Sequence, residues 1–283
     1  APPLEVRHFK GLVYEGFRKT QETLPEASLG LIVDGQYGEE VLKQATKEGF
    51  FTARCIEEPN SSSLNFLENK EAESILRTWP KNTVVKVLCR LTADPLPIEK
   101  LVNLYAATKN TGHQLLIECT NAVDPNDLPS IKEAINLCYE ATIFPAWWKL
   151  PPIEDDLFWS EIAKTIERCD PYCQGILLLG ENRALEHLST TFRRIRQQQP
   201  LVKGFAVGRS IWGAAAQDWL QGKKTDQEVI DDITKNFAKL IETSKYRKDT
   251  YDSHTRERTG KNPHSHHGAS PYFVPDSTKS RTL

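Results

Sequence analysis

The run TVVKVLCRL at residues 83–91 decides the fold, because branched and other apolar side chains follow one another in it with few interruptions. A strand with one face in water alternates apolar and polar residues, whereas a strand covered on both faces is apolar through most of its length. The run therefore predicts a strand buried on both faces, as in a parallel sheet. Its lysine, Lys86, is an ionisable group placed inside that strand.

Six further runs of this kind recur along the chain. They are LGLIVDG (29–35), GFFTARCIEEP (49–59), HQLLIECT (113–120), TIFPAWWKL (142–150), GILLLG (175–180) and VKGFAVGRSIW (202–212). Helical periodicity is present in segments that lie between these runs, at residues 125–141, 154–169 and 182–199. Alternating strands and helices predict an α/β fold, a TIM-type (β/α)8 barrel. An open doubly wound sheet is the alternative, but no GxGxxG turn follows the first clear strand.

Closing such a barrel requires an eighth strand. PLEVRHF at residues 3–9 is the candidate for a short first strand. If this segment is not a strand, the first strand of the barrel is reduced or missing.

From about residue 244 the chain is poor in aliphatic residues and locally basic. We therefore expect a barrel over residues 1–243 and a polar, extended or disordered tail over residues 244–283. The tail stretch HSHH has no acidic or cysteine partners that would complete a site, so no metal is expected.

The overall composition excludes several function classes. The 283 residues are 39% hydrophobic and 26% charged with a net charge of −2, which gives no global case for nucleic acid or membrane binding. No stretch approaches the roughly 20 apolar residues that span a bilayer, and the start APPLEVRHFK lacks the apolar run of a secretory signal. We expect a cytoplasmic protein that binds neither membrane nor nucleic acid.

Four of the predicted strands carry an ionisable side chain: Lys86, Glu118, Lys149 and Arg209. A buried isolated charge is costly, so such groups pair with one another or change their protonation state. If Lys86 and Lys149 share a pocket, their repulsion lowers a lysine pKa and frees an amine for Schiff-base formation, and Glu118 can then move protons. A structural Lys–Glu ion pair that fills the barrel is an equally good interpretation.

A phosphate site is predicted near the last two strands, where barrels frequently bind this anion. Gly204 and Gly208 let backbone amides approach an anion, and the guanidinium group of Arg209 can donate two hydrogen bonds to it. The loop that begins at Gly180 is the partner loop of this site. The alternative is that the glycines only permit strand bends.

Three further carboxylates stand at predicted strand ends. Asp34 can bind a substrate hydroxyl, or it can cap the helix that begins near Glu39, which we favour. Glu57 and Glu58 are expected to be structural or solvated.

The strand motifs of this chain, taken together, resemble those of a known family. GLIVDGQYG, VVKVLCR, LLIECT, AWWKLPP, GILLLG and VKGFAVGRSIW are similar to successive strand motifs of the aldolase-type barrel found as the C-terminal domain of myo-inositol catabolism proteins. That family is associated with 2-deoxy-5-keto-gluconate 6-phosphate aldolase activity. The resemblance covers residues 10–243, and AWWKL and GFAVGRS are its most specific parts.

The resemblance implies a Schiff-base aldolase barrel whose imine-forming lysine lies on the sixth strand. With residues 3–9 as strand one, Lys149 falls on strand six, Lys86 on strand four and Glu118 on strand five. Of the Asp-His-Arg segment that related proteins carry on their first strand, only VRHF at 6–9 is present.

Two hypotheses about function follow. The first is a metal-independent and cofactor-free lyase that acts on a phosphorylated keto sugar, with Lys149, Glu118 and Lys86 as catalytic residues. The second is an inactive barrel, a binding or scaffold protein that docks on a protein partner through residues 244–283.

Overall fold

The computed structural model describes residues 3–59, 64–67, 70–91, 96–121, 128–244 and 271–275. The strands in these ranges are β1 Ser28–Val33, β2 Phe51–Cys55, β3 Val84–Leu91, β4 Leu115–Asn121, β5 Trp147–Leu150, β6 Gly175–Leu179, β7 Val202–Ala206 and β8 Pro271–Pro275. The helices are α1 Pro3–Thr23, α2 Glu39–Lys47, α3 Ala72–Leu76, α4 Ile98–Thr111, α5 Leu128–Glu140, α6 Asp156–Cys169, α7 Leu185–Gln198, α8 Arg209–Leu220 and α9 Asp226–Ser244.

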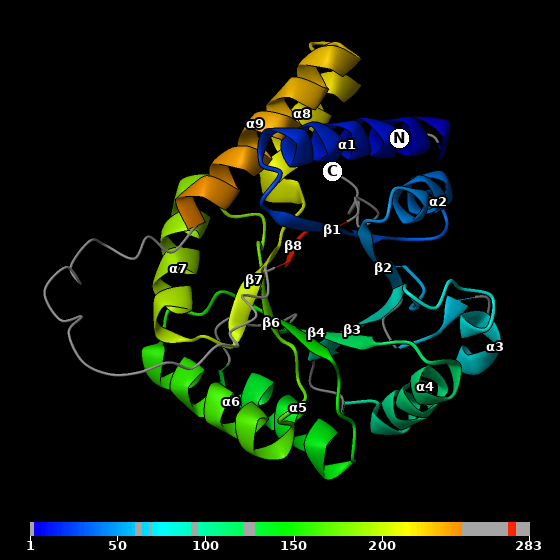
Figure 1. Ribbon diagram of the computed structural model, residues 1–283, viewed down its shortest axis with the longest axis vertical. Helices are drawn as coiled ribbons and strands as arrows, with labels where there is room; N and C mark the ends of the chain where they lie inside the picture. Colours follow the sequence, from blue (N-terminus) through cyan, green and yellow to red (C-terminus); the bar gives the residue numbers. More distant parts are fainter. Residues whose placement is uncertain are drawn as a thin grey trace, which may run out of the picture.

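These strands form a closed parallel barrel with helices around its outside (Figure 1). Each strand pairs with the next in chain order, and β8 pairs with both β7 and β1 to close the ring. The predicted α/β barrel is therefore confirmed. Each of the seven predicted strand runs overlaps one of the strands β1 to β7, since a nearly continuous apolar run is what a strand covered by helices on one side and by the barrel interior on the other requires. The run over residues 202–212 is longer than its strand, so the prediction that Arg209 lies in a strand is wrong: β7 ends at Ala206 and Arg209 begins α8.

The prediction of a first strand at residues 3–9 is wrong, because this segment is the beginning of α1. The strand numbers that depended on it are wrong as well, since Lys86, Glu118 and Lys149 lie on the third, fourth and fifth strands in chain order and not on the fourth, fifth and sixth. Its apolar pattern continues from the buried Phe9 through Leu12 and Phe17, a helical spacing, while Leu4 is exposed. The strand that completes the ring is β8, which lies within residues 244–283 (Figure 1). The rest of the segment expected to be a tail lies outside the described residues.

The apolar side chains form two cores, one inside the barrel and one between the sheet and its helices. The interior core consists of Ile32, Ala53, Val84, Leu116, Trp147, Leu177 and Ala206. Successive side chains of a strand point to opposite faces, so Trp147 faces inward while Trp148 packs outside, where its indole N–H donates to the Tyr139 hydroxyl at 3.0 Å. This alternation decides which residues of each strand reach the barrel interior.

The helix predicted over residues 154–169 forms as α6, and its side chains at Ile162 and Ile166 are buried. Leu157 is 67% exposed, whereas Trp159 is 1% exposed. The Trp159 indole N–H donates to the Ile153 carbonyl at 2.7 Å, which gives its polar atom a partner inside the protein.

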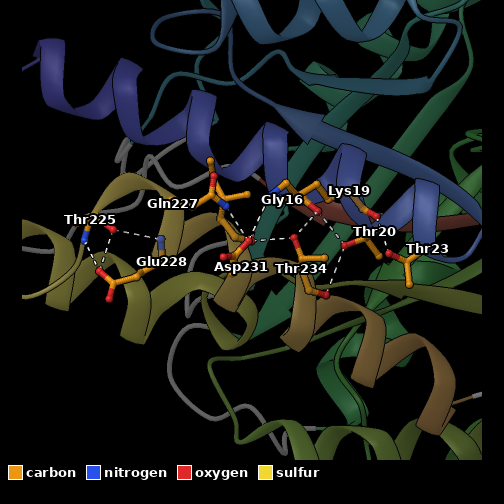
Figure 2. Close-up of polar contacts among 10 residues, drawn as sticks. Gly16, Lys19, Thr20, Thr23, Thr225, Gln227, Glu228, Asp231 and Thr234 are labelled. Carbon is orange, nitrogen blue, oxygen red and sulfur yellow. Dashed lines mark hydrogen bonds and ion pairs between the residues drawn. The ribbon is translucent and has the colours of Figure 1, made fainter.

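Helix α1 packs closely along α9 (Figure 2). The Thr20 hydroxyl donates to the Gly16 carbonyl at 2.8 Å, the Thr234 hydroxyl of α9 reaches the same carbonyl at 3.3 Å, and Lys19 pairs with Asp231 at 3.1 Å. A Cβ atom on Gly16 would stand 2.6 Å from Cγ2 of Ile233. The absence of a side chain at this position is thus what allows the two helices to approach.

We expect Gly16→Ala to lower the free energy of unfolding by about 1–3 kcal/mol, since the added methyl group overpacks the contact with Ile233. Gly11→Ala in the same helix is the matched control, because its new Cβ meets nothing within 4 Å. That change should stabilise the protein by about 0.5–1 kcal/mol through helix propensity. Urea unfolding of both variants measures the difference, and equal effects would contradict the packing argument.

Candidate active site

Three ionisable side chains enter the barrel just above its apolar interior core. Lys86 on β3, Glu118 on β4 and Lys149 on β5 each lie two residues beyond a core residue of the same strand, so they point to the same side as that residue. Glu118 and Lys149 are direct partners in the β4–β5 register. The side chains are therefore held by neighbouring strands toward the carboxyl end of the barrel.

The three side chains form one connected group. Glu118 Oε2 lies 2.8 Å from Lys86 Nζ, and Glu118 Oε1 lies 3.2 Å from Lys149 Nζ. Lys86 Nζ also donates to Glu57 Oε1 at 2.6 Å. Lys86 and Lys149 are each 3% exposed and Glu118 is 7% exposed. Glu118 thus bridges the two lysines in a site that excludes most water.

The two lysines differ in their protonation. Burial lowers the pKa of Lys149, the charge of Lys86 lowers it further, and Glu118 only partly offsets this. Burial also disfavours the ammonium form of Lys86, but Cys55, Glu118 and Glu57 outweigh burial and hold the pKa of Lys86 well above its usual range. Lys149 is therefore the lysine that gives up its proton more readily, and Lys86 remains a cation.

The charges around Lys86 indicate how a proton can move. Lys86 has two carboxylate neighbours, Glu57 and Glu118, so these three groups carry a net charge of −1 when both carboxyls are ionised. One additional proton makes the net charge zero. This proton can reside on Lys149 or on Glu118, because Lys149 Nζ and Glu118 Oε1 are close enough to share it. The pair formed by Glu118 and Lys149 is thus suited to exchange a proton with a bound molecule.

Glu57 is the second partner of Lys86, a contact that the sequence did not predict. Its side chain, expected to be structural or solvated, lies just beyond β2 and is directed at the Lys86 ammonium group. The sequence contained one indication that Glu57 points into the barrel. Glu57 follows Cys55 by two residues, and Cys55 packs against the interior core. The two-residue alternation beyond a strand end is less regular than within it, so the signal is weak.

Asp34 is buried at the carboxyl end of β1, but it does not cap a helix. Its Oδ2 pairs with the ammonium group of Lys10, which comes from α1, and its Oδ1 accepts the backbone N–H of Tyr37 at 2.8 Å. The residue before α2 is Gly38, and no side chain caps that helix. The capping interpretation is therefore wrong, while binding of a substrate hydroxyl by Asp34 stays a prediction.

The residues predicted to bind phosphate do not all lie at one edge. Gly180 directly follows β6, and Gly208 and Arg209 begin α8 just after β7, so these three lie beyond the carboxyl ends of neighbouring strands. Gly204 is placed differently, because it lies inside β7 and pairs with Leu177 of β6.

Gly180 has a packing role as well. A Cβ atom there would stand 2.7 Å from Cγ1 of Val207, so the glycine permits the two loops to approach. Glu181 and Asn182, which follow it, both adopt positive φ angles, 49° and 60°. This turn is rare for residues with a side chain and keeps the loop after β6 close to the start of α8.

Residues 3–248 match the sequence model of a family described as an uncharacterized protein conserved in bacteria, DUF2090. The chain belongs to this family. No curated protein matches this DUF2090 chain. The resemblance to the barrel of myo-inositol catabolism proteins stays a prediction beside this family assignment.

Several solved structures are similar to this DUF2090 chain. A Schiff-base-forming fructose-1,6-bisphosphate aldolase is 13% identical, covering 83% of this chain and 100% of its own, with a TM-score of 0.48. An archaeal fructose 1,6-bisphosphate aldolase is 13% identical over 79% and 99%, with a TM-score of 0.48. The fructose-bisphosphate aldolase from Slackia heliotrinireducens is 11% identical over 84% and 78%, with a TM-score of 0.49. The likeness concerns the barrel fold alone.

In the described part of this DUF2090 chain, no helix is both long enough and apolar enough to cross a bilayer.

Proposed function

We propose that this protein is a Schiff-base lyase that cleaves a carbon–carbon bond of a phosphorylated keto sugar. The observation that carries the proposal is the buried contact between Lys149 Nζ and Glu118 Oε1 at 3.2 Å, in surroundings that lower the pKa of Lys149. A nucleophilic lysine needs both features, a neutral amine and a group within reach that transfers protons.

In the first stage, the neutral amine of Lys149 attacks the keto carbon of the substrate. A carbon–nitrogen bond forms, and the carbonyl oxygen takes a proton from Glu118. The amine nitrogen then gives up a proton, which Glu118 accepts and passes to the same oxygen, so that this oxygen leaves as water. The product is a protonated imine on Lys149. Because the iminium group withdraws electrons from the adjacent carbon, the reaction needs no metal ion as an electron sink.

In the second stage, Glu118, now ionised, removes the proton of the substrate hydroxyl on the carbon beyond the bond to be broken. The carbon–carbon bond breaks, its electron pair moves into the iminium to form an enamine, and an aldehyde leaves. Protonation of the enamine carbon restores an imine, and water hydrolyses it to a ketone and free Lys149.

Lys86 and Glu57 support this cycle from the other side of Glu118. The Lys86 ammonium, 2.8 Å from Glu118 Oε2, stabilises the ionised form of Glu118. Glu57 binds Lys86 at 2.6 Å and keeps its charge compensated when Glu118 is protonated. Lys86 also disfavours a proton on Lys149 through repulsion, which supports attack by the neutral amine.

The phosphorylated sugar is placed by residues around this group. Gly180, Gly208 and Arg209 supply backbone amides and a guanidinium beyond β6 and β7, next to the strand that carries Lys149. Asp34 would accept a hydrogen bond from a substrate hydroxyl. Within this class, the resemblance to the inositol catabolism barrel favours a keto-deoxy sugar acid phosphate as the sugar.

Reduction with borohydride tests the proposal. The protein is incubated with phosphorylated keto sugars, including dihydroxyacetone phosphate, reduced, and weighed by intact-protein mass spectrometry. We expect a covalent adduct that disappears in Lys149→Ala. Lys203→Ala is the matched control, since Lys203 lies on β7 and donates to the Pro200 carbonyl at the protein surface, and it should leave the adduct unchanged.

The scaffold hypothesis makes the opposite prediction for this experiment. If the folded protein forms no adduct with any of the sugars, Lys149 is an ion-pair partner that fills the barrel. Docking through residues 244–283 would then be the function to examine. The backbone of residues 271–275 pairs with β1 and β7, so a partner would use other parts of that segment.

A further inference from the structure

A cavity lies at the opposite end of the barrel from Lys149. Its volume is about 510 Å³, within the range of roughly 300–1,000 Å³ that is typical of small-molecule sites. Its walls are the segments that precede β4, β5 and β6, together with the last turns of α4. The lyase chemistry proposed above uses none of these residues.

The cavity contains a buried carboxylate, Asp170, at the end of α6. Asp170 is 5% exposed, and its Oδ1 accepts the backbone N–H of Tyr172 at 3.2 Å. Among the described residues, no cationic side chain lies within ion-pair distance of it. Burial raises the pKa of Asp170, the expected consequence for a carboxylate without a counter-ion. A cation from outside would compensate this charge.

Three aromatic rings line the same cavity as the carboxylate. Tyr105 and Phe144 meet edge to face with their centroids 6.4 Å apart, and both line the cavity with Tyr172. Phe144 is 38% exposed and Tyr172 is 89% exposed, so both rings are accessible from solvent. Ring faces attract cations, and exposed rings gain from contact with apolar groups. A carboxylate and three rings around one cavity are the features that recognise an ammonium ion bearing methyl or methylene groups.

The helices add to the preference for positive charge. Helix α4 ends at Thr111 and α6 ends at Cys169, so the negative ends of two helix dipoles lie at the cavity wall. The competing case, an anion site, has little support. His113 is buried, both its ring nitrogens are within hydrogen-bond distance of other groups, and burial lowers its pKa. This leaves Lys109, an exposed side chain whose charge is screened by solvent.

We propose that this cavity binds a small alkylammonium ion, with the cationic group at Asp170 and its alkyl groups against the rings of Tyr105, Phe144 and Tyr172. The site is separate from Lys149, so the proposal stands whether or not the protein is a lyase. Tetramethylammonium is a suitable probe, and tert-butanol is its uncharged counterpart of similar shape.

The test is a titration of the full-length, ¹⁵N-labelled protein followed by backbone amide NMR. We expect tetramethylammonium to shift the amides of residues 170–173 with a dissociation constant in the millimolar range, and tert-butanol to bind at least about tenfold more weakly. Asp170→Asn should weaken tetramethylammonium binding by about tenfold. Asp156→Asn, at the other end of α6, is the matched control and should leave the affinity unchanged.

Because Asp170 also stabilises a turn, a second variant keeps the proposal testable if Asp170→Asn fails to fold. Tyr172→Ala removes an exposed side chain, and it should weaken binding of tetramethylammonium about three- to tenfold. The proposal is overturned if tetramethylammonium and tert-butanol bind equally, or if binding survives both substitutions.

Discussion

Glu118→Gln is expected to lower the exchange of the α-protons of dihydroxyacetone phosphate with deuterated water by about 10²–10⁴-fold. Glutamine keeps the shape of the side chain beside Lys86 and Lys149, but it cannot accept and return a proton. Removing the negative charge also removes the interaction that raises the pKa of Lys149, so its amine stays neutral and able to attack. Exchange is followed by loss of the proton NMR signal.

Two accompanying measurements distinguish this role from a structural one. The borohydride adduct should form more slowly in Glu118→Gln yet reach the wild-type end point, because water can supply the protons over a longer time. Glu57→Gln is the matched control, since Glu57 contacts Lys86 at 2.6 Å in the same group of charges. We expect only a several-fold loss of exchange there. Equal losses in both variants would argue against Glu118 as the proton-transfer group.

Lys86→Met is expected to lower the free energy of unfolding by about 3–5 kcal/mol at neutral pH. The substitution removes the cation that lies between Glu57 and Glu118 and leaves carboxylate charge buried without its main partner. Urea unfolding measures the loss. Lys203→Met on the outside of β7 is the matched control, and its effect should stay within about 0.5 kcal/mol.

The difference in stability between wild type and Lys86→Met should depend on pH in both directions. The folded-state pKa of Lys86 is raised, so its contribution is fully present below the unfolded value of about 10.4 and is lost as the pH rises toward the folded value. Toward acid pH, protonation of the carboxyl groups removes the buried charge, and the difference should also shrink. A difference that is constant from pH 4 to alkaline solution would contradict an electrostatic origin.

Lys86→Met should also change the reactivity of Lys149. The charge of Lys86 is one of the causes that lower the pKa of Lys149. Without it, a larger fraction of Lys149 is protonated at neutral pH, and formation of the borohydride adduct should require a higher pH. This pH profile separates the effect on the amine from the loss of stability.

Local sequence patterns determined the strands and the inward direction of the candidate site residues. A strand alternates its faces with a period of two, so Glu118 shares a face with Leu116, and Lys149 shares one with Trp147. Both neighbours lie in the barrel interior, which places the two ionisable groups there as well. The nearly continuous apolar runs likewise required cover on both faces and hence a parallel α/β fold.

The secondary structure of short segments without a strong hydrophobic period could not be predicted from such patterns. Residues 3–9 are too few to distinguish a strand from the first turns of a helix, and their helical continuation becomes decisive only through the packing of Phe9 and Leu12 in the core. Strand β8 contains two prolines and follows a long polar stretch, so its apolar character was not sufficient to predict a barrel strand. Its place is set by the open edges of β1 and β7.

The sequence by itself thus determined the fold class, the succession of βα units and the three charged residues that enter the barrel. Only the tertiary structure decided which charges meet. Lys86 and Glu57 are 29 positions apart, and Lys10 and Asp34 are 24 positions apart on different elements. Such pairs form because closing the barrel brings the carboxyl ends of its strands, and the helix packed beside them, to one place. The physical reason is that burial makes pairing necessary, while the geometry of the closed ring selects the partner.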